Sequence, residues 1–137
     1  MRNRVSSNSS PREMNKLRIL IVEDNAPFRQ ILRENLQTSL PAIAIDEVAD
    51  GTEVLQKVDT FLPDLIFMDI RLPGENGLEL TKKIKAVYPN MIIFILTQYD
   101  TPEYQKAAFQ CGADGFLVKN SFNHIRLEAL IKSFCKT

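Results

Sequence analysis

Five short and nearly continuous apolar segments recur along the chain, and amphipathic stretches separate them. Uninterrupted apolar character of this kind is typical of strands that are buried on both faces. Strands and helices in alternation favour a parallel sheet covered by helices on both sides. The pattern predicts an α/β fold of five βα units, (βα)5, with right-handed crossovers. The predicted strands are Leu17–Val22, Ile43–Val48, Leu65–Met68, Met91–Leu96 and Gly115–Val118.

Apolar residues at helical spacing predict the helices between and after these strands. A fourth helix is expected over Pro102–Cys111, ending at Gly112 because glycine readily adopts the left-handed conformation. Ser121 is the predicted N-cap of the last helix, which runs to about Phe134. The predicted apolar faces of the first, second, third and last helices carry, in this order, Phe28, Ile31, Leu32 and Leu36; Val54, Leu55 and Val58; Leu78, Leu80, Ile84 and Val87; and Ile125, Ala129 and Leu130.

The length and composition indicate a single folded domain. The chain has 137 residues, of which 45% are hydrophobic and 25% are charged, as is ordinary for one globular core. Residues 1–15 are rich in Ser, Asn and Arg and contain little to bury, so we expect a flexible N-terminal tail. The folded domain is expected over residues 16–137.

Charge and hydropathy argue against some classes of partner. The formal net charge is zero, but four basic residues and one acidic residue within the first sixteen leave the remainder of the chain with a net charge of −3. An acidic body argues against direct nucleic-acid binding by this domain. The longest apolar run, Met91–Leu96, is far too short to cross a bilayer. We therefore expect a cytoplasmic domain without membrane contact.

Polar residues follow the predicted strands at the points where these end. Glu23 and Asp24 follow the first strand, Asp69 the third, Thr97 the fourth and Lys119 the fifth. Ligand sites of open parallel sheets lie beyond the carboxyl ends of the strands, which share one edge. We therefore expect three carboxylates, a hydroxyl and an ammonium group on one rim.

Three neighbouring carboxylates repel one another and require positive charge. Oxygen ligands without Cys or His suit a small hard cation such as Mg²⁺, and Lys119 supplies a second charge. Each residue alone also has an ordinary structural interpretation, as a helix cap, a turn residue or a solvated loop. Their common position at strand ends favours a functional site.

Residues 16–135 resemble the receiver domains of bacterial two-component response regulators, the CheY-like superfamily. The matching segments are Ile-Leu-Ile-Val-Glu23-Asp24, Asp64-Leu-Ile-Phe-Met-Asp69-Ile-Arg-Leu-Pro-Gly-Glu-Asn-Gly77, Leu96-Thr97 and Gly112-Ala-Asp-Gly-Phe-Leu-Val-Lys119. The resemblance implies a flavodoxin-like, doubly wound five-stranded sheet in the order 2-1-3-4-5.

The resemblance also implies the chemistry. Asp69 would accept a phosphoryl group from the phosphohistidine of a sensor histidine kinase or phosphotransfer protein. Asp24 and Asp69 would ligate Mg²⁺, Glu23 would hold one of its waters, and the backbone carbonyl of Arg71 would be a further ligand. The protein would be a signalling switch that catalyses only its own phosphorylation and dephosphorylation.

Two further positions would act in catalysis and switching. Lys119 would neutralise phosphoryl oxygens, and Thr97 would bond the phosphoryl group. Movement of Thr97 would let Phe116, three residues before the lysine, rotate inward. The expected readout surface is the fourth helix, fifth strand and fifth helix, which could also form a homodimer. Arg71 and Gln98 carry long side chains near the acceptor, and we hypothesise that they change the lifetime of the phosphorylated state.

The resemblance favours a receiver cut from a longer transcription regulator, with a DNA-binding output domain outside this chain, over one that works alone. One alternative is a receiver-like interaction module that is not phosphorylated. Another is a magnesium-dependent phosphohydrolase of the haloacid-dehalogenase type, although Asp69-Ile-Arg71 lacks the second aspartate of that motif. A flavin- or nucleotide-binding module would need a Gly- or Ser-rich loop where Glu23-Asp24-Asn25 stands.

Overall fold

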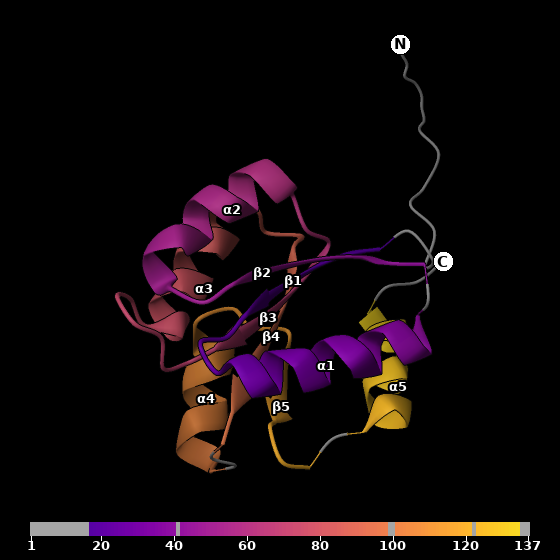
Figure 1. Ribbon diagram of the computed structural model, residues 1–137. Helices are drawn as coiled ribbons and strands as arrows, with labels where there is room; N and C mark the ends of the chain where they lie inside the picture. The colour runs from indigo at the N-terminus through magenta and orange to yellow at the C-terminus, as the bar shows by residue number, and fades with distance from the viewer. Residues whose placement is uncertain (1–16, 41, 99–100, 122, 135–137) are drawn as a thin grey trace.

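The computed structural model describes residues 17–40, 42–98, 101–121 and 123–134. The predicted tail, residues 1–15, lies outside the described residues. Among the described residues, strands and helices alternate as predicted, and a 3₁₀ turn precedes the second helix (Figure 1). The elements are β1 (Arg18–Val22), α1 (Ala26–Ser39), β2 (Ala44–Val48), η2 (Gly51–Glu53), α2 (Val54–Phe61), β3 (Leu65–Asp69), α3 (Gly77–Val87), β4 (Ile92–Thr97), α4 (Pro102–Gln110), β5 (Gly115–Val118) and α5 (His124–Phe134).

The five described strands form one parallel sheet in the order β2-β1-β3-β4-β5. Strand β1 lies between two partners, so that Ile19 pairs with Ile45 of β2 and with Leu65 of β3. The chain adds β2 on one side of β1 and β3, β4 and β5 on the other, so the switch point of the strand order lies between β1 and β3. This order confirms the predicted doubly wound fold and places a crevice at the carboxyl ends of these two strands.

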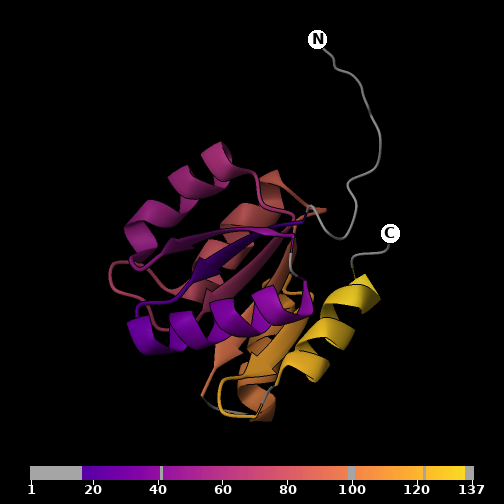
Figure 2. The same cartoon turned by 45° about the vertical axis from the view of Figure 1, so that its right-hand side comes forward.

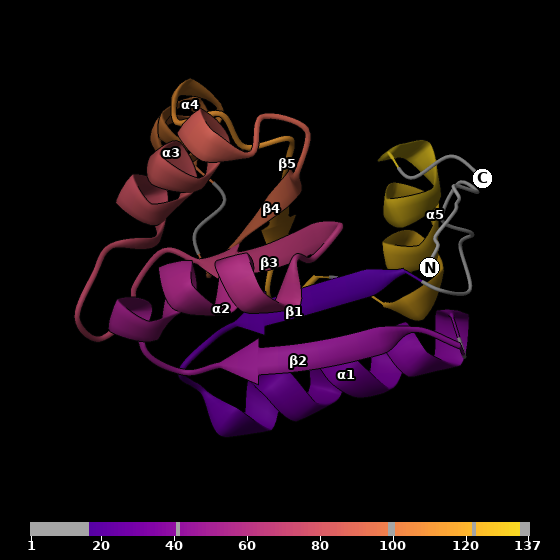
Figure 3. The same cartoon turned by 90° about the horizontal axis from the view of Figure 1, so that it is seen from above.

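Helices cover both faces of the sheet (Figures 2 and 3). Successive strand residues point to opposite faces, and β1 shows the result. Ile19 and Ile21 pack with α1 and α5, whereas Leu20 and Val22 pack with α2, α3 and α4. The same alternation in β3 and β4 explains why these strands read as continuous apolar runs.

Some details of the predicted helix faces were wrong. Ile31, Val87 and Ile125 are 50%, 68% and 67% exposed. In α5 the buried residues are Leu127 and Ile131, because this helix begins at His124 and its register differs from the predicted one.

The predicted N-cap of α5 was wrong as well. The side chain of Asn123, and not that of Ser121, accepts the capping hydrogen bond from the backbone N–H of Arg126 (3.0 Å). No helix among the described residues is long and apolar enough to span a membrane.

Candidate functional site

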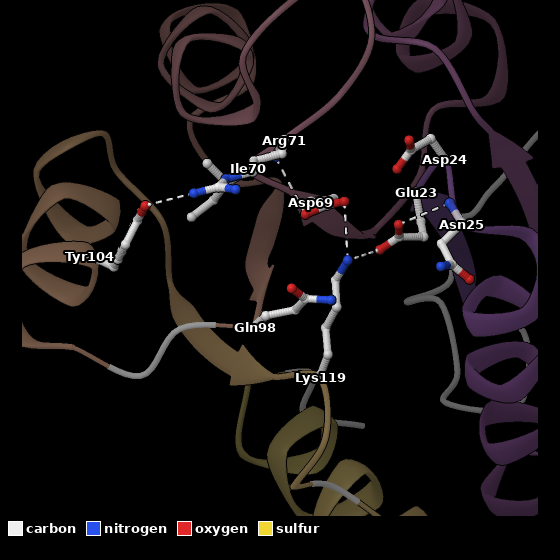
Figure 4. Close-up of a pocket in the computed structure, with 9 residues that line it drawn as sticks. All are labelled: Glu23, Asp24, Asn25, Asp69, Ile70, Arg71, Gln98, Tyr104 and Lys119. Atoms are coloured by element: carbon white, nitrogen blue, oxygen red, sulfur yellow. Dashed lines mark hydrogen bonds and ion pairs between the residues drawn. The ribbon is translucent and has the colours of Figure 1, made fainter.

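Acidic and basic side chains meet at the carboxyl ends of β1, β3 and β5. Glu23 and Asp24 follow β1, Asp69 ends β3, and Lys119 follows β5. With Arg71 they contribute to the lining of a pocket of about 450 Å³ (Figure 4). The structure thus brings together the carboxylates and the ammonium group that the strand-end rule selected.

Lys119 connects two of these carboxylates. Its Nζ lies 2.6 Å from Glu23 Oε1 and 3.1 Å from Asp69 Oδ2. The ammonium also lies 5.3 Å from the centre of the Phe28 ring, within the range of a cation–π contact. Burial disfavours the charged ammonium, but the hydrogen bond to Glu23 and the charge of Asp69 outweigh burial and raise the pKa of Lys119. The side chain is therefore held as a cation beside Asp69.

Glu23 is the most deeply buried carboxylate of the site, with a relative exposure of 0%. Desolvation by this burial raises its pKa from 4.5 to about 7, and the negative charge of Asp69 adds to the rise. Hydrogen bonding from Lys119 and from the Asn25 N–H opposes it. The ion pair with Lys119 lacks the angles of a regular hydrogen bond, so among the described residues Glu23 Oε1 has no hydrogen-bond donor in good geometry.

These observations fit a divalent cation. Carboxylate oxygens of Glu23, Asp24 and Asp69 all lie within 4.8 Å of one another. Three carboxylates beside one ammonium group leave an excess of negative charge, which a bound cation offsets. An all-oxygen donor set with one solvent-exposed member suits Mg²⁺, which keeps several waters. The residues present therefore match the expected metal chemistry.

We expect the effect of Glu23→Gln on the stability of the metal-free protein to be more favourable at pH 8 than at pH 5. The folded state keeps the Glu23 proton up to about pH 7, while the unfolded chain releases it near pH 4.5. Stability of the native protein is therefore lost as pH rises between these values, by on the order of 2 kcal/mol. Glutamine cannot ionise and avoids this loss. Urea unfolding of both proteins with chelator at pH 5 and pH 8 measures the free energy of unfolding. An equal effect of Glu23→Gln at both pH values would contradict the raised pKa of Glu23.

Asn25 shapes the first loop of the site and was not predicted as a site residue. Its side-chain oxygen caps α1 by accepting from the Phe28 N–H (2.9 Å). Its own backbone N–H donates to Glu23 Oε2 (3.0 Å) and orients that carboxylate. An asparagine directly before Ala26-Pro27 is a capping signal that would have identified it.

Close packing of Gly77 connects the start of α3 to the end of β3, where Asp69 lies. The Gly77 backbone N–H donates to the Ile70 carbonyl (2.9 Å) at the start of α3. A Cβ atom at this position would lie 1.9 Å from the Asp69 carbonyl oxygen. Asn76 caps the same helix by accepting from the Leu78 N–H (2.7 Å). The helix start therefore rests directly against the backbone of the acceptor.

The remaining pocket residues come from the loop after Asp69, from the end of β4 and from α4. Arg71 and Gln98 line the pocket, as their proximity to the acceptor predicted, and Tyr104 of α4 lines it as well. The Arg71 N–H lies 3.4 Å from Asp69 Oδ1, at the outer limit of hydrogen bonding. Tyr104 was not predicted as a site residue, and no local sequence signal places it at the pocket.

The two predicted switch residues lie close to the site without lining the pocket. Thr97 ends β4, has a relative exposure of 3%, and accepts at its carbonyl from the Lys119 N–H (2.8 Å). Phe116 of β5 is half-buried against the core cluster shared with α4. Their switching roles stay predictions.

Comparison with known proteins identifies the family. The sequence model described as the response regulator receiver domain matches residues 19–132, which is most of the chain. The chain belongs to the response regulator receiver domain family. Membership of this family accounts for the polar residues at the strand ends, and it makes the domain part of two-component signalling. The expected cytoplasmic location stays a prediction.

Full-length relatives and solved receiver structures agree with this placement. The oxygen regulatory protein NreC of Staphylococcus carnosus is 38% identical over 106 residues, covering 77% of this chain and 49% of that protein. The transcriptional regulatory protein DegU of Brevibacillus brevis is 29% identical over 116 residues, covering 85% and 49%. The receiver chain thus spans about half the length of these curated relatives.

Among solved structures, a two-component response regulator from Clostridium difficile is 28% identical, with a TM-score of 0.79 over 87% of this chain and 95% of that one. A CheY-like receiver domain protein from Methanospirillum hungatei is 27% identical, with a TM-score of 0.77 over 86% and 92%. The family match favours a receiver over a haloacid-dehalogenase-type enzyme or a nucleotide-binding module.

Proposed function

We propose that this receiver domain accepts a phosphoryl group on Asp69 with the help of Mg²⁺, and that the phosphorylated form is the signalling state. The observation that carries the proposal is the position of the Lys119 ammonium, 3.1 Å from Asp69 Oδ2 on a rim of three carboxylates. A structural ion pair would not need a second and third carboxylate beside it. The clustering supports a site that binds cations and anions in turn.

The proposed transfer step uses these groups as follows. A carboxylate oxygen of Asp69 forms a bond to phosphorus while the P–N bond of a phosphohistidine breaks. The electron pair of that bond remains on the imidazole nitrogen, which takes up one proton from water. Lys119, held as a cation, stabilises the negative charge on the phosphoryl oxygens during transfer and in the product.

Asp24, Asp69 and a water held by Glu23 would bind the metal, together with the backbone carbonyl of Arg71. When bound, Mg²⁺ supplies positive charge that neutralises phosphoryl oxygens and the carboxylate cluster. Thr97 would then bond the phosphoryl group, and Phe116 would turn inward to change the surface formed by α4, β5 and α5. Phe109 and Ile125 expose apolar side chains on α4 and α5, 51% and 67% respectively, which suits a contact surface for an output domain or a second receiver.

Beryllofluoride, which stands in for the phosphoryl group, tests the proposal without a kinase. At about 100 times its dissociation constant, a ligand specific for the folded state adds about 2.7 kcal/mol of stability. For a domain of this size we expect Tm to rise by roughly 10 °C in Mg²⁺. The rise should vanish with chelator and in Asp24→Asn. A Tm that stays the same in Mg²⁺ and beryllofluoride would favour the interaction module.

We further propose that the phosphodonor is a sensor histidine kinase or a phosphotransfer protein and that the output is control of transcription. The family match supports the first, because receivers of two-component systems take their phosphoryl groups from such donors. The printed name of DegU, a transcriptional regulatory protein, supports the second. A DNA-binding domain would carry this output, since the net charge of −3 over residues 17–137 disfavours direct DNA binding by the receiver.

A further inference from the structure

Arg71 connects the loop after the acceptor to the first turn of α4. It follows Asp69 by two residues, and its Nη2 atom lies 3.4 Å from the hydroxyl oxygen of Tyr104, which is 33 residues further along the chain. Figure 4 shows the Arg71 side chain directed toward Tyr104, while Lys119 is directed toward Asp69 and Glu23. The two cationic side chains of the described pocket residues therefore contact different partners.

The charge of the pocket changes when Asp69 is phosphorylated. The single negative charge of the carboxylate is replaced by a phosphoryl group that carries about −1.5 to −2 charges near neutral pH and three acceptor oxygens. Lys119 is already engaged by two carboxylates. Arg71 is the other cation among the described pocket residues, so the new charge attracts its guanidinium in addition to Lys119 and a bound Mg²⁺.

The contact of Arg71 with Tyr104 is weaker than a contact with a phosphoryl group would be. Its contact with Tyr104 is an exposed bond of 3.4 Å to a neutral hydroxyl, at the outer limit of hydrogen bonding. A guanidinium binds a phosphoryl group through two charge-assisted hydrogen bonds, which are roughly twice as strong as neutral ones. Arg71 is exposed, and Arg71 and Asp69 both contribute to the lining of one pocket, so the exchange would take place by rotation of the arginine side chain.

We propose that Arg71 leaves Tyr104 and binds the phosphoryl group when Asp69 is phosphorylated, and that this releases the first turn of α4. The inference rests on the proposed function, because it requires a phosphoryl group on Asp69. Tyr104 lies in the turn capped by the Thr101 side chain, so a change in its contacts acts where α4 begins. Arg71 thereby becomes both a phosphoryl-binding residue and a link to α4.

A double-mutant cycle measures the exchange, with calorimetric titration of beryllofluoride in saturating Mg²⁺. Arg71→Gln should weaken beryllofluoride binding about tenfold, because charged hydrogen bonds are lost. Tyr104→Phe should tighten it two- to threefold, because the competing partner is removed. The double variant should bind within twofold of Arg71→Gln alone. Tyr88→Phe is the matched control, since its hydroxyl contacts Asp59 away from the pocket and its loss should leave binding unchanged.

Hydrogen exchange at the Tyr104 and Gln105 amides reports the release of α4. Beryllofluoride should raise exchange there several-fold in the wild type, whereas in Arg71→Gln exchange should be raised before the ligand is added. Affinity for Mg²⁺ alone should not fall in Arg71→Gln, because the substitution keeps the backbone carbonyl.

Four outcomes would overturn the partner exchange. The first is that Arg71→Gln binds beryllofluoride with wild-type affinity, and the second is that Tyr104→Phe has the same effect in the wild type and in Arg71→Gln. The third is that beryllofluoride leaves hydrogen exchange at the Tyr104 and Gln105 amides of the wild type unchanged. The fourth is that Arg71→Gln loses as much affinity for Mg²⁺ as for beryllofluoride. Phosphoryl uptake by the wild type, followed by intact mass, separates the two proposals. If the wild type takes up neither phosphoryl group nor beryllofluoride, the proposed function fails and the exchange fails with it.

Discussion

Lys119→Gln is expected to slow the phosphorylation of Asp69 by acetyl phosphate by roughly 100-fold or more. The ammonium lies 3.1 Å from Asp69 Oδ2 and is held there by Glu23. Glutamine keeps much of the side-chain length but removes the charge that neutralises the phosphoryl oxygens during transfer. The rate of mass gain at saturating Mg²⁺ measures the effect.

The control for this prediction is Lys85→Gln. Lys85 forms a similarly shielded pair with Asp114, at 2.7 Å, but joins α3 to the loop before β5 and does not line the pocket. Both substitutions break a partly buried ion pair, so both should lower stability. Phosphorylation at the wild-type rate in folded Lys119→Gln would show that this ammonium is structural only.

Gly77→Ala is expected to have the largest effect of a single added methyl group. The new Cβ would lie 1.9 Å from the Asp69 carbonyl oxygen, so either α3 or the acceptor must move. Forcing a group into close-packed backbone costs roughly 3 kcal/mol of unfolding free energy. Displacement of Asp69 by about 1 Å should also slow phosphorylation by up to roughly 100-fold. Urea unfolding and the rate of mass gain measure the two effects.

Gly112→Ala separates close packing from backbone strain. Gly112 has a positive φ of 99° after α4, and the nearest atom to its added Cβ would be Cγ of the flexible Lys85 side chain at 3.2 Å. We expect a loss of about 1 kcal/mol there, with no change in phosphorylation. If Gly77→Ala behaves like Gly112→Ala in both measurements, the contact with Asp69 does not position the acceptor.

The layout of the fold could be predicted because each buried parallel strand is a continuous apolar run. The alternate contacts of Ile19 and Leu20 with the two helical layers show why both must be apolar. The positions of Glu23, Asp69 and Lys119 were predictable for a related reason, since parallel strands end at one edge. The topology of a parallel sheet thus predicts that these charged groups lie together.

What could not be predicted depends on contacts between distant segments. The contact of Arg71 with Tyr104 joins residues 33 positions apart, and neither residue type indicates the other. The exposure of Ile31 and Ile125 depends on which faces of α1 and α5 pack on the sheet, and apolar spacing alone does not define these faces. The start of α5 was wrong because Ser121 and Asn123 are both good capping residues and only the second is placed to accept from the helix.

The central claim is that Asp69 is the phosphoacceptor, and intact-mass analysis tests it most directly. The protein is incubated with acetyl phosphate and Mg²⁺, alongside Asp69→Ala and a sample with chelator. The account predicts a gain of about 80 Da, one phosphoryl group, that is absent in Asp69→Ala and in chelator. A folded wild-type protein that gains no mass and also binds no beryllofluoride, or an adduct that persists in Asp69→Ala, would contradict it.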